Sequence, residues 1–252
     1  MKLVISPLEA RKWLGITAVG LFLASLASLA VKFFVLKFAP NVNNIDLFVD
    51  FFHLDREKNL PSLFSALLLL ISSICLAIIA LGNTRANHRY KKHWFALSLI
   101  FLFLSIDEWN SFHELLTDPL RANLNTSGIF FFAWVIVAIP LVATLFLVYL
   151  KFLRDLPPHT KKLFFMAGGL YLSGTLGMEL INGYYFSQNV NAILAQEPIP
   201  AMIYAVMTHI EELLEMVGIV TFIYALTSYM SRYVEQLEIW VDDRQKSSIS
   251  KM

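Results

Sequence analysis

Acidic side chains occur in three apolar stretches of this sequence, where charges are costly. The first stretch, Asp107 to Glu114, follows fourteen residues from His93 to Ile106 that are almost all apolar. The second surrounds Glu179, and the third runs from His209 to Glu215. The acids are Asp107, Glu108, Glu114, Glu179, Glu211, Glu212 and Glu215, and two histidines, His113 and His209, accompany them. Because ionisable groups inside a membrane mark functional sites, we expect the three stretches to meet and build one acidic site.

The carboxylates of this cluster have no basic partner nearby in the sequence. No Lys or Arg lies within the middle of any of the three stretches. A carboxylate at the centre of a membrane helix costs roughly 2.5–3.5 kcal/mol, so seven uncompensated carboxylates would approach roughly 20 kcal/mol. This exceeds the net stability of a typical fold, which is roughly 5–15 kcal/mol. The cluster therefore predicts bound cations, shared protons or water as compensation.

A divalent transition metal is the leading interpretation of the cluster, because carboxylate and imidazole ligands suit Zn, Fe or Mn. The candidate metal ligands are His113, His209, Glu212, Asp107, Glu114, Glu179 and Glu215. The candidate catalytic residues are Glu108, Glu211 and Ser111, with the two glutamates as general bases. Ferritin-like di-iron or di-manganese sites use Glu-x-x-His twice, whereas this chain has only the reversed His209-x-x-Glu212. A zinc site with two histidines and one acid is equally compatible.

The elements that position these residues are predicted to be six transmembrane helices. The chain is 57% hydrophobic and 15% charged, whereas soluble domains are about 45–50% apolar and about 25% charged. The spans are expected at about 13–38, 62–82, 93–116, 128–150, 163–186 and 201–230, and each is long enough to cross a bilayer. Residues 1–252 are thus predicted to be one all-α, polytopic bundle, with a polar cytosolic tail at 231–252.

The distribution of basic residues predicts the orientation of the bundle. Lys and Arg occur before Trp13, in the loops at 85–92 and 151–162, and in the tail, whereas the other loops are poor in them. The positive-inside rule then places both termini in the cytoplasm. The third and fifth spans run outward and the sixth runs inward, so the three acidic stretches share the outer half of the bilayer.

Two further features limit the possible functions. The net charge of +1 suggests no nucleic-acid partner, and membrane lipid is the expected environment. The segment from Pro40 to Pro61 is polar with an amphipathic middle, which favours an interfacial helix or a lid over the acidic site.

Two stretches carry a resemblance to known proteins. Leu104 to Glu108 followed by Ser111 to Glu114, together with Glu211 to Gly218, resemble a family of uncharacterised bacterial multi-pass membrane proteins. The resemblance implies the bacterial inner membrane and no particular activity. Ser111, Asp107 and His113 also resemble part of the zinc site of alkaline-ceramidase-like membrane hydrolases. This chain lacks the His-x-x-x-His of that family and has six predicted spans in place of seven.

Several functions stay open at this point. The first is a metal-dependent membrane enzyme, a hydrolase or oxidoreductase acting on a lipid or lipid-soluble substrate. The second is a proton- or cation-coupled transporter, although the sequence shows neither an inverted repeat nor paired broken helices. The third is a non-catalytic membrane subunit or assembly factor with an internal polar network. A haem held between His113 and His209 is a further alternative.

Overall fold

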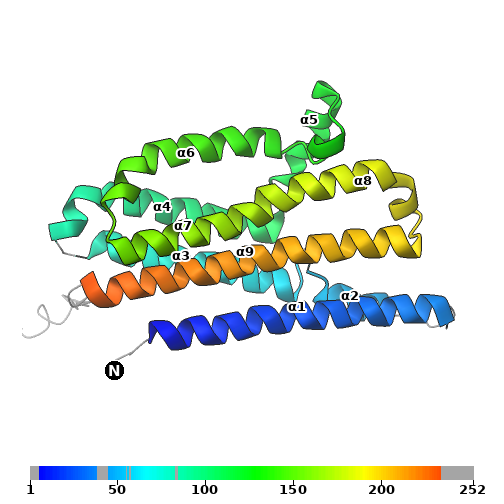
Figure 1. The fold of residues 1–252 in the computed structure, drawn as a ribbon, viewed down its shortest axis with the longest axis horizontal. Coiled ribbons are helices and arrows are strands. Elements are labelled where there is room, and N and C mark those ends of the chain that lie inside the picture. Colours follow the sequence, from blue (N-terminus) through cyan, green and yellow to red (C-terminus); the bar gives the residue numbers. More distant parts are fainter. Residues whose placement is uncertain (1–5, 39–44, 55, 57, 83–84, 234–252) are drawn as a thin grey trace, which may run out of the picture.

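The protein is all-helical over the described residues of the computed structural model, and no strand occurs among them. The structure describes residues 6–38, 45–54, 56, 58–82 and 85–233. Figure 1 shows long helices lying side by side along one axis, with a short helix projecting near one end. The predicted all-α fold is confirmed. The polar tail predicted at 231–252 lies almost wholly outside the described residues.

The helices follow the predicted spans with shifted ends. They are α1 (Pro7–Phe38), α2 (Ile45–Phe52), α3 (Leu60–Leu81), α4 (Arg85–Asn110), η1 (Glu114–Leu116), α5 (Thr117–Leu124), η2 (Gly128–Phe130), α6 (Val135–Asp155), α7 (Pro158–Leu172), the π-helix η3 (Ser173–Met178), α8 (Glu179–Leu194) and α9 (Pro198–Tyr233). Five described segments are long and apolar enough to cross a membrane, or six if α4 and the bent segment after it form one span. This agrees with a multi-pass membrane protein.

The start of α1 and the end of α9 lie at the same end of the bundle (Figure 1). Between them the chain runs back and forth along the bundle axis, with α7, η3 and α8 forming one continuous pass. An even number of passes follows from this arrangement. The side of the membrane on which the two ends lie stays a prediction.

Helix α2 packs along α1, and a turn connects it to α3. The side chain of Asn59 accepts a hydrogen bond from the Ser62 N–H at 3.1 Å, and Ser62 bonds back to the Asn59 N–H at 3.0 Å. This reciprocal capping box satisfies donors that the first turn of α3 would leave free. The Asn59 amide also donates to the carbonyl oxygens of Asp50 and His53. The turn therefore fixes the end of α2 against the start of α3.

Helix α9 is the central element, because it packs against α1, α3, α7, η3 and α8. One apolar cluster joins its last turns to Trp94, Phe152 and Phe164. A second cluster joins Met216 and Ile223 of α9 to α1 and α3. Both clusters include residues of α9, so this helix links α1 and α3 to α4, α6 and α7.

We expect Gly218→Ala to destabilise the bundle by about 1–3 kcal/mol, the usual effect of overpacking. A Cβ atom at Gly218 would lie 2.7 Å from the backbone nitrogen of Tyr171 on α7. Gly168→Ala is the matched control, since its Cβ would meet nothing within 4 Å. Unfolding in mixed detergent micelles, followed by circular dichroism, measures both. Equal stability of the two variants would contradict the close approach of α7 and α9.

Candidate functional site

The first part of the site is a break at the end of α4. The predicted span at 93–116 is not one continuous helix, because α4 ends at Asn110 and the chain bends by 72°. Ser111 adopts a left-handed conformation with φ 50°. The Asp107 carboxylate accepts the backbone N–H of His113 at 3.1 Å and lies 2.7 Å from His113 Nδ1. Local side-chain bonds of this kind compete with helix continuation.

The second part is the π-helix η3, which directly precedes Glu179. It packs closely on α9, because a Cβ at Gly174 would lie 2.7 Å from Glu215 Cγ and 2.8 Å from the carbonyl oxygen of Glu211. Single π-turns inside α-helices occur often at functional sites. The predicted fifth span thus contains an irregular turn where it meets the acids of α9.

The centre of the site is a pair of glutamates, Glu179 on α8 and Glu211 on α9, whose carboxyl groups lie within hydrogen-bonding reach of each other. The Trp134 indole donates to Glu179 Oε1 at 2.6 Å, and the Asn182 amide donates to Glu211. Ionised carboxylates are acceptors only. A hydrogen bond between two carboxyl groups therefore requires that one of them carries a proton.

Asn182 contributes a second unusual feature to this centre. Its side chain is fully buried, and its Oδ1 atom has no hydrogen-bond partner in the structure. A buried carbonyl oxygen without a donor costs about 1–3 kcal/mol. The amide oxygen is therefore available to a proton-bearing group or a cation next to the glutamate pair.

Other predicted residues lie near the pair. On one side, the ring of His113 lies 4.6 Å from the Trp134 ring, and His113 and the exposed Glu114 are in electrostatic range of Glu179. On the other side, Glu215 hydrogen-bonds with Thr175 and is in electrostatic range of Glu108. The structure thus places acids from all three predicted stretches at one site.

Three predicted residues remain: His209, Glu212 and Ser111. His209 is fully buried, and its Nε2 lies 2.6 Å from Ser25 Oγ on α1. Its ring packs edge-on against the ring of His53, so His113 and His209 contact different elements and share no ligand position. Glu212 is half-buried on α9. Ser111 is buried at the break in α4, where its N–H donates to the carbonyl oxygen of Asp107.

The predicted metal centre receives no support from this geometry. Within the ranges that the structure describes, no three His, Cys, Asp or Glu side chains are arranged to hold one metal ion. Binding of Zn, Fe or Mn stays a prediction.

Comparison with known proteins adds a family. A family model described as a domain of unknown function, DUF8692, matches residues 13–229. The chain belongs to this family. DUF8692 covers every residue of the acidic site, and the expectation of a family without an assigned activity is confirmed. No curated protein matches the chain, and no solved structure does. The bacterial origin and the likeness to membrane hydrolases stay predictions.

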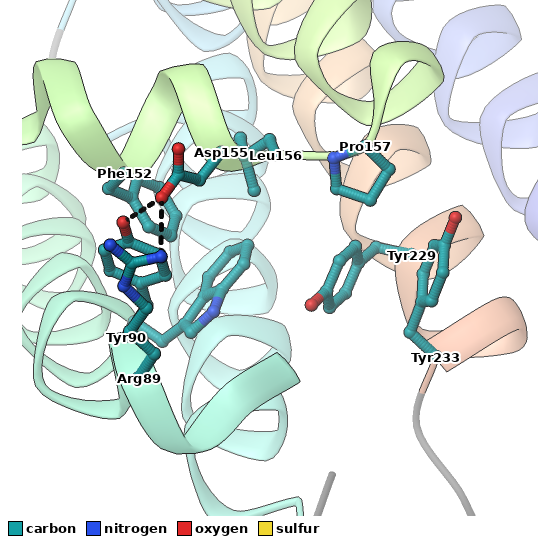
Figure 2. A pocket seen from close by; sticks show the side chains of 9 residues that line it. Arg89, Tyr90, Phe152, Asp155, Leu156, Pro157, Tyr229 and Tyr233 are labelled. Atoms are coloured by element: carbon teal, nitrogen blue, oxygen red, sulfur yellow. Dashed lines mark hydrogen bonds and ion pairs between the residues drawn. The ribbon is translucent and has the colours of Figure 1, made fainter. Parts of the chain in front are cut away.

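A separate cavity of about 450 Å³ lies at the opposite end of α4. Figure 2 shows Arg89 and Tyr90 directed toward Asp155 at the end of α6, with Tyr229 and Tyr233 of α9 across the cavity. Arg89 Nη1 lies 3.1 Å from Asp155 Oδ2, and the Tyr90 hydroxyl lies 2.5 Å from it. The charged groups here pair with each other. No feature of the sequence predicted this cavity.

Proposed function

We propose that this protein is a membrane transporter driven by protonation of the Glu179–Glu211 pair. The observation that carries the proposal is the proximity of the two carboxyl groups, which can hydrogen-bond to each other only if one of them carries a proton. Loss of that proton would leave two adjacent carboxylates. At a separation of about 4 Å and an effective dielectric constant of about 20, their repulsion is roughly 4 kcal/mol. Repulsion of this size would separate α8 from α9 and so drive the conformational change of the transporter.

The depth of the pair suits proton exchange with one side of the membrane. Lys162 on α7 and Glu179 are 17 residues apart in one helical pass, which corresponds to about 26 Å. Lys92 and Asp107 are 15 residues apart on α4, or about 23 Å. With the basic residues at the cytoplasmic interface and a hydrocarbon core of about 30 Å, the acids lie close to the outer boundary. Protons would reach them through His113 and the exposed Glu114.

Irregular helices at the acids also favour transport. The broken end of α4 and the π-helix η3 both adjoin Glu179. Discontinuous helices form the substrate and ion sites of many secondary transporters. The sequence showed no paired broken helices, and the structure has two irregular segments at one site. A cation such as Na⁺ could replace the proton, because the two carboxylates and the Asn182 oxygen are hard oxygen ligands.

Infrared spectroscopy tests the shared proton directly. We expect the wild-type protein in detergent at neutral pH to show the carbonyl band of a protonated carboxyl group, and Glu179→Gln and Glu211→Gln each to lose it. Glu197→Gln, at an exposed position before α9, is the matched control and should keep the band. A wild-type spectrum without this band would remove the basis of the proposal.

Proton flux into proteoliposomes with an internal pH dye tests the coupling. Under an imposed membrane potential, we expect uptake by the wild type that falls about tenfold or more in Glu211→Gln and not in Glu197→Gln. Flux that depends on Na⁺ would assign the site to that cation. Flux equal to that of empty liposomes, together with one or two tightly bound transition metals per chain, would instead favour the metal-dependent enzyme.

A further inference from the structure

A second cavity, of about 660 Å³, lies between α1, α2 and the connection from α8 to α9. The end of α1 and the start of α9 share the end of the bundle that lies opposite the start of the chain (Figure 1). None of the seven acids of the candidate site lines the cavity. Its size falls in the range of about 300–1,000 Å³ that is common for small-molecule sites. This cavity is therefore a second candidate site, separate from the glutamate pair.

Apolar side chains of two helices line the cavity. On α9 they are Ala201, Met202 and Ala205, and their spacing places them on one helical face. On α1 they are Leu29 and Phe33, one turn apart. Surfaces of this kind bind an aliphatic chain, because contact with them removes the chain from water.

His53 supplies a polar group at the same cavity. It directly follows α2 and lines the cavity, and its Nδ1 atom is buried without a hydrogen-bond partner in the structure. Buried polar atoms in native proteins are almost always paired with protein, water or ligand. The His53 ring therefore offers a hydrogen bond that no other side chain of the structure takes up.

The charge state of His53 indicates which group would form this bond. Burial is the largest cause that lowers the pKa of His53 to about 4, so the ring is neutral at neutral pH. A neutral imidazole has one nitrogen that donates and one that accepts. A hydroxyl group can do both, so it suits the ring in either tautomer.

The residues behind His53 hold its ring in place. The ring packs edge-on against that of His209, with centroids 4.9 Å apart. His209 Nε2 lies 2.6 Å from Ser25 Oγ, which also accepts the backbone N–H of Leu54 at 3.2 Å. His209 and Ser25 are both fully buried. A ring held in this way is preorganised, which lowers the entropic cost of binding a ligand.

The charged side chains at the cavity have interactions of their own. Arg56 Nη1 lies 2.7 Å from Asp50 Oδ2, so these two charges compensate each other. Lys32, which also lines the cavity, is not without a partner either. The selection of a ligand therefore rests on His53 and on the apolar side chains of α1 and α9.

We propose that this cavity binds a lipid-soluble alcohol, with the hydroxyl group at His53 and the aliphatic chain along the apolar side chains of α1 and α9. A long-chain primary alcohol and a monoacylglycerol share this chemistry. The inference goes beyond the glutamate pair, and neither depends on the other.

Binding of tritiated oleyl alcohol to the purified protein in detergent, measured by scintillation proximity, tests the proposal. The unlabelled competitors are oleyl alcohol, monoolein and cis-9-octadecene, which has the same chain and no polar group. We expect both alcohols to displace the label at about fivefold lower concentration than octadecene, the effect of one hydrogen bond. The better of the two alcohols identifies the source of the ligand. Equal displacement by octadecene, or the absence of saturable binding, would overturn the proposal.

Variants locate the binding. His53→Phe should bind the alcohols about fivefold more weakly and octadecene as tightly as the wild type, whereas His159→Phe, at an exposed position on α7, should keep the preference for alcohols. Ala205→Trp should fill the cavity and remove saturable binding, and Ala201→Phe serves the same purpose if the first variant aggregates. A preference for alcohols that persists in His53→Phe, or binding that persists in a monodisperse filled variant, would overturn the site.

Discussion

Replacing Asp107 with alanine should lower the free energy of unfolding by about 2–4 kcal/mol. The Asp107 carboxylate accepts two hydrogen bonds from His113, one from the backbone and one from the ring, and it is 9% exposed. A hydrogen bond to a charged group contributes about 1.5–3 kcal/mol. Removing one partner of a buried ion pair costs about 3–5 kcal/mol. The expected loss for Asp107→Ala lies between these two ranges, because the His113 side chain is about one-third exposed.

The matched control is Asp118→Ala on α5. Asp118 pairs with Arg121 three residues later, and its side chain is 85% exposed, so its loss should cost about 0–1 kcal/mol. Denaturant titration in mixed micelles measures both free energies. The bend after α4 supplies a second readout, because a pair of spin labels at Phe103 and Leu124, both exposed, should show a broader distance distribution in Asp107→Ala. Two variants of equal stability and unchanged distances would show that Asp107 does not hold the bend.

The presence of several long apolar helices was predictable, because it depends on runs of apolar residues in the sequence. Runs of about 20 apolar residues between polar loops define each span, and every predicted span overlaps a long helix or a helix pair of the structure. The meeting of the acidic stretches was also predictable from the sequence. Stretches at similar distances from the basic loops are expected at a similar depth in the membrane. The structure brings Glu179 and Glu211 into contact although 32 positions separate them.

The break in α4 was not predictable from periodicity. The contact between Asp107 and His113 lies at this break. A 3.6-residue period places Ser111 and Glu114 on the same helical face as Asp107, but only if the helix continues past Asn110. The position of His209 was not predictable for a different reason. His209 lies in the same stretch as the acids of α9, but which neighbouring helix faces it depends on packing. Ser25 of α1 takes that place, and nothing local in the sequence records it.

The stability of the protein should fall as the pH decreases from about 6.5 to about 4, and His53→Phe should remove part of this dependence. Burial, with Arg56 and Lys32 nearby, lowers the pKa of His53 to about 4, so the folded state binds this proton less tightly than the unfolded state. The contribution of the neutral ring is therefore complete above pH 6.5 and is lost as the pH falls through this range. At about 1.4 kcal/mol for each pH unit by which the pKa is lowered, the loss of stability amounts to about 3 kcal/mol.

Phenylalanine is the informative replacement, because it keeps an aromatic ring at the position where His53 packs edge-on against His209, with centroids 4.9 Å apart. It also removes the Nδ1 atom that lacks a partner, so His53→Phe should be at least as stable as the wild type at pH 7. Near pH 4 the variant should be about 2–3 kcal/mol more stable than the wild type. His159→Phe, at an exposed position on α7, should leave the profile unchanged. Parallel profiles for wild type and His53→Phe would mean that the acid sensitivity arises elsewhere, in which case burial, together with Arg56 and Lys32, lowers the pKa of His53 less than expected.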